Sequence, residues 1–304
     1  MPTQWFGEGD FALSLSRAEM DNQLLNRAKE VGVTVIEGTG VTDIESQDGR
    51  VVAVRTRATN GDLSEINADL FIDATGRSRI LTKLVEKKHD IAQLRVKPGL
   101  VGFKAHLRDV DLANGLCEIY SFPGGYAGLS HVEGGLFNLC FLIKAATVRS
   151  VGSDAAELVK QVVTKNKRAA VTLRESSASN DWLAVSIESF GKKNTSSATN
   201  LFTIGDAAAF IDPFTGSGMV MAFESAGVLA GAILSNPGSS EQIAKEYHAA
   251  YKKKFANRLR VCSMLRRTAF MPNLATAIVT LLGISTNARR RLARATRGGR
   301  SELF

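Results

Sequence analysis

The chain has 304 residues, of which 44% are hydrophobic and 22% are charged, a composition typical of a globular protein that buries its own core. Its three cysteines form no CxxC pair and its four histidines show no metal-ligand spacing, so neither a disulfide framework nor a metal site is expected. The start lacks a signal-peptide pattern, and the most apolar tract (274–284) is shorter than the roughly 20 residues that span a bilayer. We therefore expect a cytoplasmic protein.

The net charge of +8 is unevenly distributed. Residues 252–300 contain 13 Lys or Arg and no Asp or Glu, so the rest of the chain is mildly acidic. A basic segment of this kind predicts an anionic partner. Its only aromatic residues are Phe255 and Phe270, which argues against nucleic acid. Two interpretations remain: a helical cap with a solvated basic face, or a peripheral contact with an anionic membrane.

The first 80 residues predict a helix followed by strands. Ser16 to Glu19 has the S-x-x-E form of a capping box, and the helix that follows should stop near Gly32. VTVIEG (33–38) predicts a strand. RVVAVRTRA (50–58) alternates like a half-buried strand, and Asn60-Gly61 predicts a hairpin turn back through LSEINA. A buried strand then runs through DLFIDATGRS (69–78) and ends at the turn DATG.

The pattern changes to several strand-like runs between about 96 and 190, interrupted by one helical patch at 155–170. These runs predict a mainly antiparallel sheet inserted before the next buried strand, at 201–205. That strand ends at GDAA, and beyond Ser217 the pattern is helical, with breaks at Pro237-Gly238 and Pro272.

Two strands thus end at polar turns, DATG and GDAA. Ligands of open α/β sheets bind outside the carboxyl ends of the strands, and glycines that open a helix let its backbone amides approach a ligand. The carboxylate of Asp206 can accept hydrogen bonds from hydroxyl groups. Together the two turns predict a polyol beside an electron-rich or anionic group, and a flavin nucleotide has both.

The spacing GDAA-x4-P-x2-G-x-G-x3-A resembles the second flavin-binding motif of the superfamily of FAD-dependent aromatic hydroxylases and geranylgeranyl reductases. LFIDATGRS and the segment that starts at Ser16 resemble two further parts of that family. The resemblance implies FAD as cofactor and NAD(P)H as electron donor. It also implies a set of cofactor-binding residues: Arg17, Val41, Thr75, Gly76, Gly205, Asp206, Pro213, Gly216, Ser217 and Gly218.

The family opens with a strand, a GxGxxG turn and a helix that hold the FAD pyrophosphate. This sequence has no such unit: Gly38-Thr39-Gly40, its nearest imitation, continues to Asp43 where a glycine is needed. We therefore expect either a gene start placed too late or a truncated chain. In the second case we expect weak FAD retention and a chain that aggregates or melts at low temperature.

The expected fold is α/β (α+β): an incomplete three-layer FAD-binding domain (1–95 and 191–250), a β-rich substrate domain (96–190) and a basic helical region (251–304). In the geranylgeranyl reductase branch of that family, a segment of aromatic residues and proline lines the substrate cavity. Here that wall would consist of Tyr120, Phe122, Pro123 and Tyr126, without the tryptophan expected there.

The resemblance implies an oxidoreductase acting on a small apolar aromatic, polyketide or isoprenoid substrate, by hydroxylation or by reduction of lipid double bonds. Because the cofactor supplies the difficult chemistry, no catalytic side chain is nominated. Halogenation is less expected, since the WxWxIP signature is absent. The alternative from another class is a non-catalytic paralogue that binds a lipid or a protein without flavin.

Overall fold

The computed structural model describes residues 15–89, 99–187, 190–192, 195–270, 280 and 283–297. The chain divides into two compact units. The first comprises Met1–Val33, Val96–Ser189 and Met264–Ala293, and the second comprises Thr34–Arg95, Phe190–Ser263 and Arg294–Phe304. The predicted limits of the β-rich domain lie at or beside two of these boundaries. The first unit also includes residues 1–33 and 264–293, which the prediction had assigned to the FAD-binding domain and to the basic helical region.

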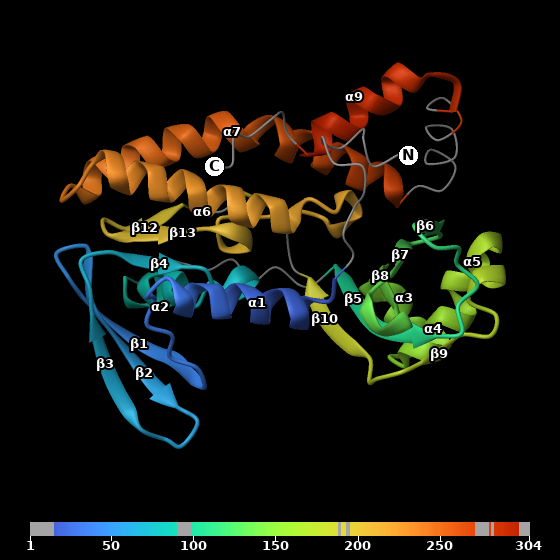
Figure 1. The fold of residues 1–304 in the computed structure, drawn as a ribbon, viewed down its shortest axis with the longest axis horizontal. Helices are drawn as coiled ribbons and strands as arrows, with labels where there is room; N and C mark the ends of the chain where they lie inside the picture. The colour runs from blue at the N-terminus through green and yellow to red at the C-terminus, as the bar shows by residue number, and fades with distance from the viewer. Residues whose placement is uncertain are drawn as a thin grey trace. The chain divides into compact units, whose positions relative to one another are not determined.

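An antiparallel sheet forms the centre of the first unit, with strand order β10-β5-β8-β7-β6 and β9 paired to β5 (Figure 1). Alternating apolar residues in the sequence explain why these runs are strands with one buried face. Three short helices in the same unit carry apolar residues into its core. The elements are β5 (Leu100–Arg108), β6 (Cys117–Phe122), β7 (Gly125–His131), β8 (Phe137–Lys144), β9 (Ser177–Ala178), β10 (Leu183–Ile187), α3 (Ala145–Val151), α4 (Ala155–Gln161) and α5 (Lys167–Thr172).

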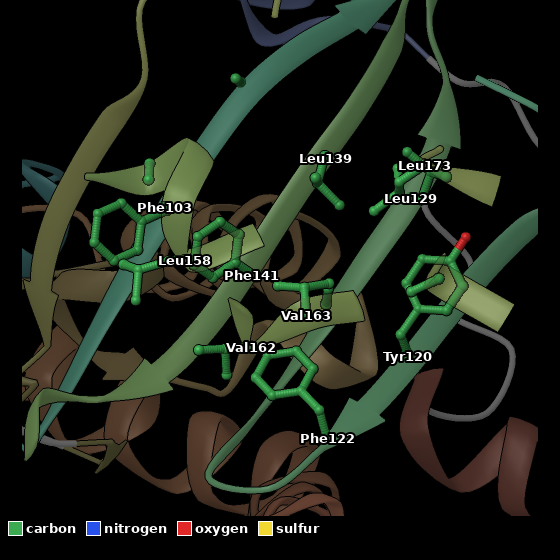
Figure 2. Close-up of a cluster of buried hydrophobic side chains, with 14 of the residues drawn as sticks. Phe103, Tyr120, Phe122, Leu129, Leu139, Phe141, Leu158, Val162, Val163 and Leu173 are labelled. Atoms are coloured by element: carbon green, nitrogen blue, oxygen red, sulfur yellow. The ribbon is translucent and has the colours of Figure 1, made fainter. Parts of the chain in front are cut away.

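Figure 2 shows the core between this sheet and its helices. Phe103 and Phe141 stack there with ring centroids 4.9 Å apart, and Leu158 of α4 packs into the same cluster. Tyr120 and Phe122 are each 1% exposed and belong to the same core. One face of the sheet is therefore fully occupied by packing.

The second unit contains two three-stranded sheets. The antiparallel sheet β1-β2-β3 follows the predicted strand and hairpin, and α2 (Ile80–Lys88) contacts it. The other sheet has the order β12-β13-β4. Strands β11 (Gly191–Lys192) and β14 (Ala209–Phe210) form a further pair. The remaining bounds are β1 (Thr39–Gln47), β2 (Arg50–Ala58), β3 (Leu63–Asn67), β4 (Phe71–Asp73), β12 (Ser196–Ala198) and β13 (Leu201–Thr203).

The strand predicted at 33–38 is not formed. Val33 is 53% exposed and Ile36 is 58% exposed, so the apolar residues that indicated a strand contact little of the described structure. A strand is stable only when its backbone pairs with a neighbour. Within the described part of the chain, no strand pairs with this segment.

Four longer helices lie among the described residues. Helix α1 (Arg17–Glu30) begins as predicted, since the Oγ of Ser16 accepts a hydrogen bond from the backbone N–H of Glu19 at 3.2 Å. Helices α6 (Gly218–Ser235) and α7 (Ser240–Ala269) run side by side and are separated at the predicted Pro237-Gly238 break (Figure 1). Helix α9 (Thr286–Arg297) follows. The predicted break at Pro272 lies outside the described residues.

One described helix, α6, is long and apolar enough to cross a membrane by length and composition. Three of its residues, Met221, Leu229 and Ala232, nevertheless belong to the core of the second unit together with α7. A core helix of a globular protein meets the same criteria, so this finding is weak support for a membrane span.

Candidate functional site

The two predicted polar turns lie side by side at one edge of the β12-β13-β4 sheet. Strands β4 and β13 are parallel neighbours, with Thr203 opposite Asp73 in the last register position. Their carboxyl ends therefore coincide, and the short helices that follow, η2 (Gly76–Ser78) and η5 (Gly205–Ala207), contact each other. The backbone N–H of Ile204 donates to the carbonyl of Asp73 at 3.2 Å, which fixes the two turns together.

The side chain of Asp73 holds the DATG turn together through hydrogen bonds. Its carboxylate is fully buried and accepts hydrogen bonds from the N–H and Oγ1 of Thr75 (3.1 and 2.5 Å) and from those of Thr82 (3.0 and 2.8 Å). The Oγ1 of Thr75 also accepts from the backbone N–H of Ile80 at 2.8 Å. The Thr75 side chain is thus engaged within the turn. Gly76 has a left-handed backbone (φ 64°), as such a turn requires.

The GDAA turn packs tightly on α6. Gly205 has φ 58°, and a Cβ on it would lie 3.2 Å from the Cβ of Ala222. Its N–H donates to the Oγ of Ser225 at 2.8 Å. Because Gly205 and α6 are in close contact, the next residue, Asp206, is held at the end of the strand. Asp206 is half-buried, so part of its side chain is accessible.

Helix α7 supports this turn through two tyrosines that the sequence analysis did not identify. The hydroxyl of Tyr247 donates to the carbonyl of Thr203 at 2.7 Å. One turn later, burial and then the negative charge of Asp206 raise the pKa of Tyr251 above its usual value. The spacing of aromatic residues at 247, 251 and 255 indicated a buried helix face, but nothing in it pointed to β13.

The loop from 212 to 218 ends at a helix start without a side-chain cap. Asp212 caps η6 (Pro213–Thr215), and Gly216 follows in a left-handed conformation (φ 60°). Ser217 is fully buried and precedes α6, but its side chain makes no capping hydrogen bond. Pro213 and Gly216 are exposed. The side chain of Ser217 therefore does not cap the first amides of α6, and the helix N-terminus carries a partial positive charge there.

Two other predicted cofactor-binding residues lie elsewhere. Arg17 belongs to the first unit, and its guanidinium forms an exposed ion pair with Asp21, at 2.8 Å. Val41 lies in the second unit at a β-bulge of β1, where it pairs with Thr56 and packs beside a buried cluster.

The predicted substrate wall needs a correction. Tyr120 and Phe122 point into the core of the first unit, as Figure 2 shows, so they do not line an open cavity. Strand residues alternate between the two faces, and the sequence did not reveal which face the helices cover. Tyr126 is buried on the other face, with its ring centroid 5.9 Å from that of Phe270. Pro123 is exposed in the turn between the strands.

The paired turns offer a consistent set of groups. Asp206 presents an accessible acceptor beside the uncapped start of α6, since η5 and α6 are in contact. A carboxylate accepts hydrogen bonds from hydroxyls, and helix amides donate to an electron-rich edge. This arrangement fits a flavin, whose ribityl chain carries hydroxyls and whose ring edge becomes negative on reduction.

Comparisons of sequence identify related proteins. Residues 2–96 match the tryptophan halogenase family model. Tryptophan 2-halogenase of Chondromyces crocatus is 24% identical over 241 residues, which cover 74% of this chain and 44% of the relative. The chain therefore spans less than half the length of that curated relative.

Solved structures share the fold over almost the whole chain. The flavin-dependent brominase Bmp2 aligns with a TM-score of 0.73 at 18% identity, covering 93% of this chain and 70% of the brominase. A geranylgeranyl bacteriochlorophyll reductase-like protein of Thermoplasma acidophilum aligns with a TM-score of 0.70 at 21% identity, covering 92% of this chain and 72% of that protein. The predicted superfamily and fold class are confirmed.

Proposed function

Because the chain has the fold of the FAD-dependent oxidoreductases, we propose that it functions as a flavin-dependent oxidoreductase of the halogenase type, acting on an apolar aromatic substrate. The observation that carries the proposal is the pair of polar turns at the adjoining ends of β4 and β13, with Asp206 beside the uncapped start of α6. The match of residues 2–96 to the tryptophan halogenase model supports halogenation. The sequence analysis had placed hydroxylation and reduction first.

Within this proposal the protein binds and orients the cofactor. Asp206 accepts hydrogen bonds from the ribityl hydroxyls, and the amides at the start of α6 donate to the flavin ring edge. The flavin supplies the redox chemistry when bound, with NAD(P)H as the proposed source of its electrons.

Reduction of lipid double bonds is the second candidate. The TM-score of 0.70 with the reductase-like protein is close to that with the brominase, and the chain lacks the WxWxIP signature. Halide dependence separates the two reactions. With chemically reduced FAD, oxygen, bromide and an aromatic substrate such as indole, a halogenase gives a brominated product visible by its isotope pattern. Consumption of reduced flavin by an isoprenoid alkene, without any need for halide, would favour reduction.

The proposal is tested first through flavin binding. Titration of the 304-residue chain with FAD, followed by flavin fluorescence, compares Asp206→Ala with Asp181→Ala, an exposed aspartate in the first unit. Hydrogen bonds to a charged group contribute about 1.5–3 kcal/mol, so Asp206→Ala should weaken binding by roughly 10- to 100-fold. Asp181→Ala should leave it unchanged. Equal affinities for all three chains, or no FAD binding at all, would favour the non-catalytic alternative.

A further inference from the structure

Helix α9 is rich in arginine. Its twelve residues, TNARRRLARATR, contain five arginines and no acidic residue. Arg290 and Arg291 are exposed, and neither forms an ion pair with any described residue.

The exposed arginines lie on one face of the helix. Asn287, Arg290 and Arg291 follow the spacing of one helical side, and all three are exposed. The opposite side faces the protein, because Ala293 is 1% exposed and Leu292 is half-buried. The helix is therefore anchored through its small apolar residues, and the arginine face remains accessible.

An exposed apolar side chain lies just before this helix. Ile284, two residues before α9, is 80% exposed, although an isoleucine is normally buried. Exposed basic residues beside an exposed apolar residue are the combination that binds the surface of an anionic bilayer: the charges attract the headgroups and the apolar side chain inserts between them.

We propose that α9 and Ile284 form a surface that docks reversibly on anionic lipid membranes. An anionic lipid surface is favoured over nucleic acid because α9 has no aromatic residue that could stack on bases. The proposal is independent of the flavin chemistry, because none of these residues lies in the paired turns.

The experiment uses co-sedimentation of the 304-residue chain with vesicles. Vesicles of phosphatidylcholine alone are compared with vesicles that also contain phosphatidylserine, at low and at high salt. Binding should require phosphatidylserine and should fall as salt screens the charges. In the double variant Arg290→Gln/Arg291→Gln, binding at low salt should drop roughly thirtyfold, since each basic residue near the surface contributes about fivefold. Ile284→Ser should also weaken binding.

The matched control is Arg57→Gln/Lys83→Gln, which removes two exposed positive charges from β2 and α2. It should bind like the unmodified chain. Circular dichroism checks that each variant is folded, and the lipid and salt dependence of the unmodified chain decides the question without any variant. Equal binding to both kinds of vesicle, or none, would overturn the proposal. So would salt-sensitive binding to single-stranded DNA or polyglutamate in the absence of vesicle binding.

Discussion

Gly205 meets two requirements that a larger residue cannot satisfy together. Its φ of 58° is a conformation that side chains with a Cβ rarely adopt, and an added Cβ would lie 3.2 Å from the Cβ of Ala222. The same residue leads directly to Asp206. Backbone geometry at this one position therefore sets where the proposed ribityl-binding carboxylate is held.

Gly205→Ala should destabilise the protein by about 1–3 kcal/mol, because the strained backbone and the close contact with α6 both oppose the new methyl group. Urea unfolding measures the change. Gly40→Ala is the matched control, since Gly40 is an exposed strand glycine with nothing within 4 Å of an added Cβ. It should change stability by less than about 0.5 kcal/mol. Equal losses in the two variants would show that the geometry of Gly205 has no special cost.

Single residues were predictable where a motif combines several chemical constraints. The spacing of GDAA with the later glycines predicted Gly205 and Asp206 at the end of a strand and Gly216 shortly before a helix, where the structure has them. Tyr251 was not predictable as a neighbour of Asp206, because the two residues are brought together only by the packing of α7. Nor could the sequence assign Tyr120 to the core, since alternation gives two faces without stating which one is covered.

At the scale of elements, helices α6 and α7 are joined by a buried ion pair. Arg258 Nη1 lies 2.6 Å from Glu224 Oε2, and their side chains are 2% and 3% exposed. Lys254 adds a longer contact with the same carboxylate at 3.9 Å. Removing one partner would leave the other charge buried without this ion pair, which is costly. Replacing both residues with apolar side chains leaves no buried charge to neutralise.

Arg258→Met alone should lower the free energy of unfolding by about 3–5 kcal/mol, whereas the double variant Glu224→Leu/Arg258→Met should recover most of that loss. Thermal or urea unfolding of the three chains provides the comparison. If the double variant is no more stable than the single one, the pair contributes by its specific geometry and not by mutual neutralisation.

Elements with strong periodicity and clear ends were predicted well. The strands of the insert, the Asn60-Gly61 hairpin and the helix break at Pro237-Gly238 occur as expected. Ser16 caps α1 as expected, but the predicted capping box is only half formed, because the backbone N–H of Ser16 donates to Glu133 and not to Glu19. The strand predicted at 33–38 was wrong, because its apolar pattern was present but the described structure supplies no neighbouring strand. Whether a segment finds a neighbouring strand depends on the whole fold, and the apolar pattern of that segment alone cannot predict it.

At the scale of the whole molecule, α6 leaves an apolar stripe accessible. Met219, Phe223 and Leu234 are 49%, 47% and 82% exposed, and Gly227 and Ala230 between them are exposed as well. The spacing places these residues along one side of the helix. Contiguous apolar surface of this kind promotes association with other proteins or with further copies of the chain.

The chain should therefore self-associate as its concentration rises, as measured by light scattering. Phe223→Gln/Leu234→Gln should reduce this association clearly. The control Leu63→Gln/Leu116→Gln replaces two exposed leucines outside α6, and it should have little effect. A chain that stays monomeric at all concentrations would show that the stripe does not drive association. Added FAD should change the outcome little, because the stripe lies beyond the paired turns.

The parallel pairing of β4 with β13 has a consequence for how the protein folds. The two strands start at residues 71 and 201, and the whole antiparallel insert lies between them in the chain. Closing so long a loop is slow compared with forming the hairpins of the insert, which pair neighbours in sequence. During synthesis the insert can fold before β13, the partner strand of β4, has left the ribosome. The edge that carries both polar turns is therefore among the last parts of the molecule to take shape, and Asp206 gains its final surroundings only after α7 has been made.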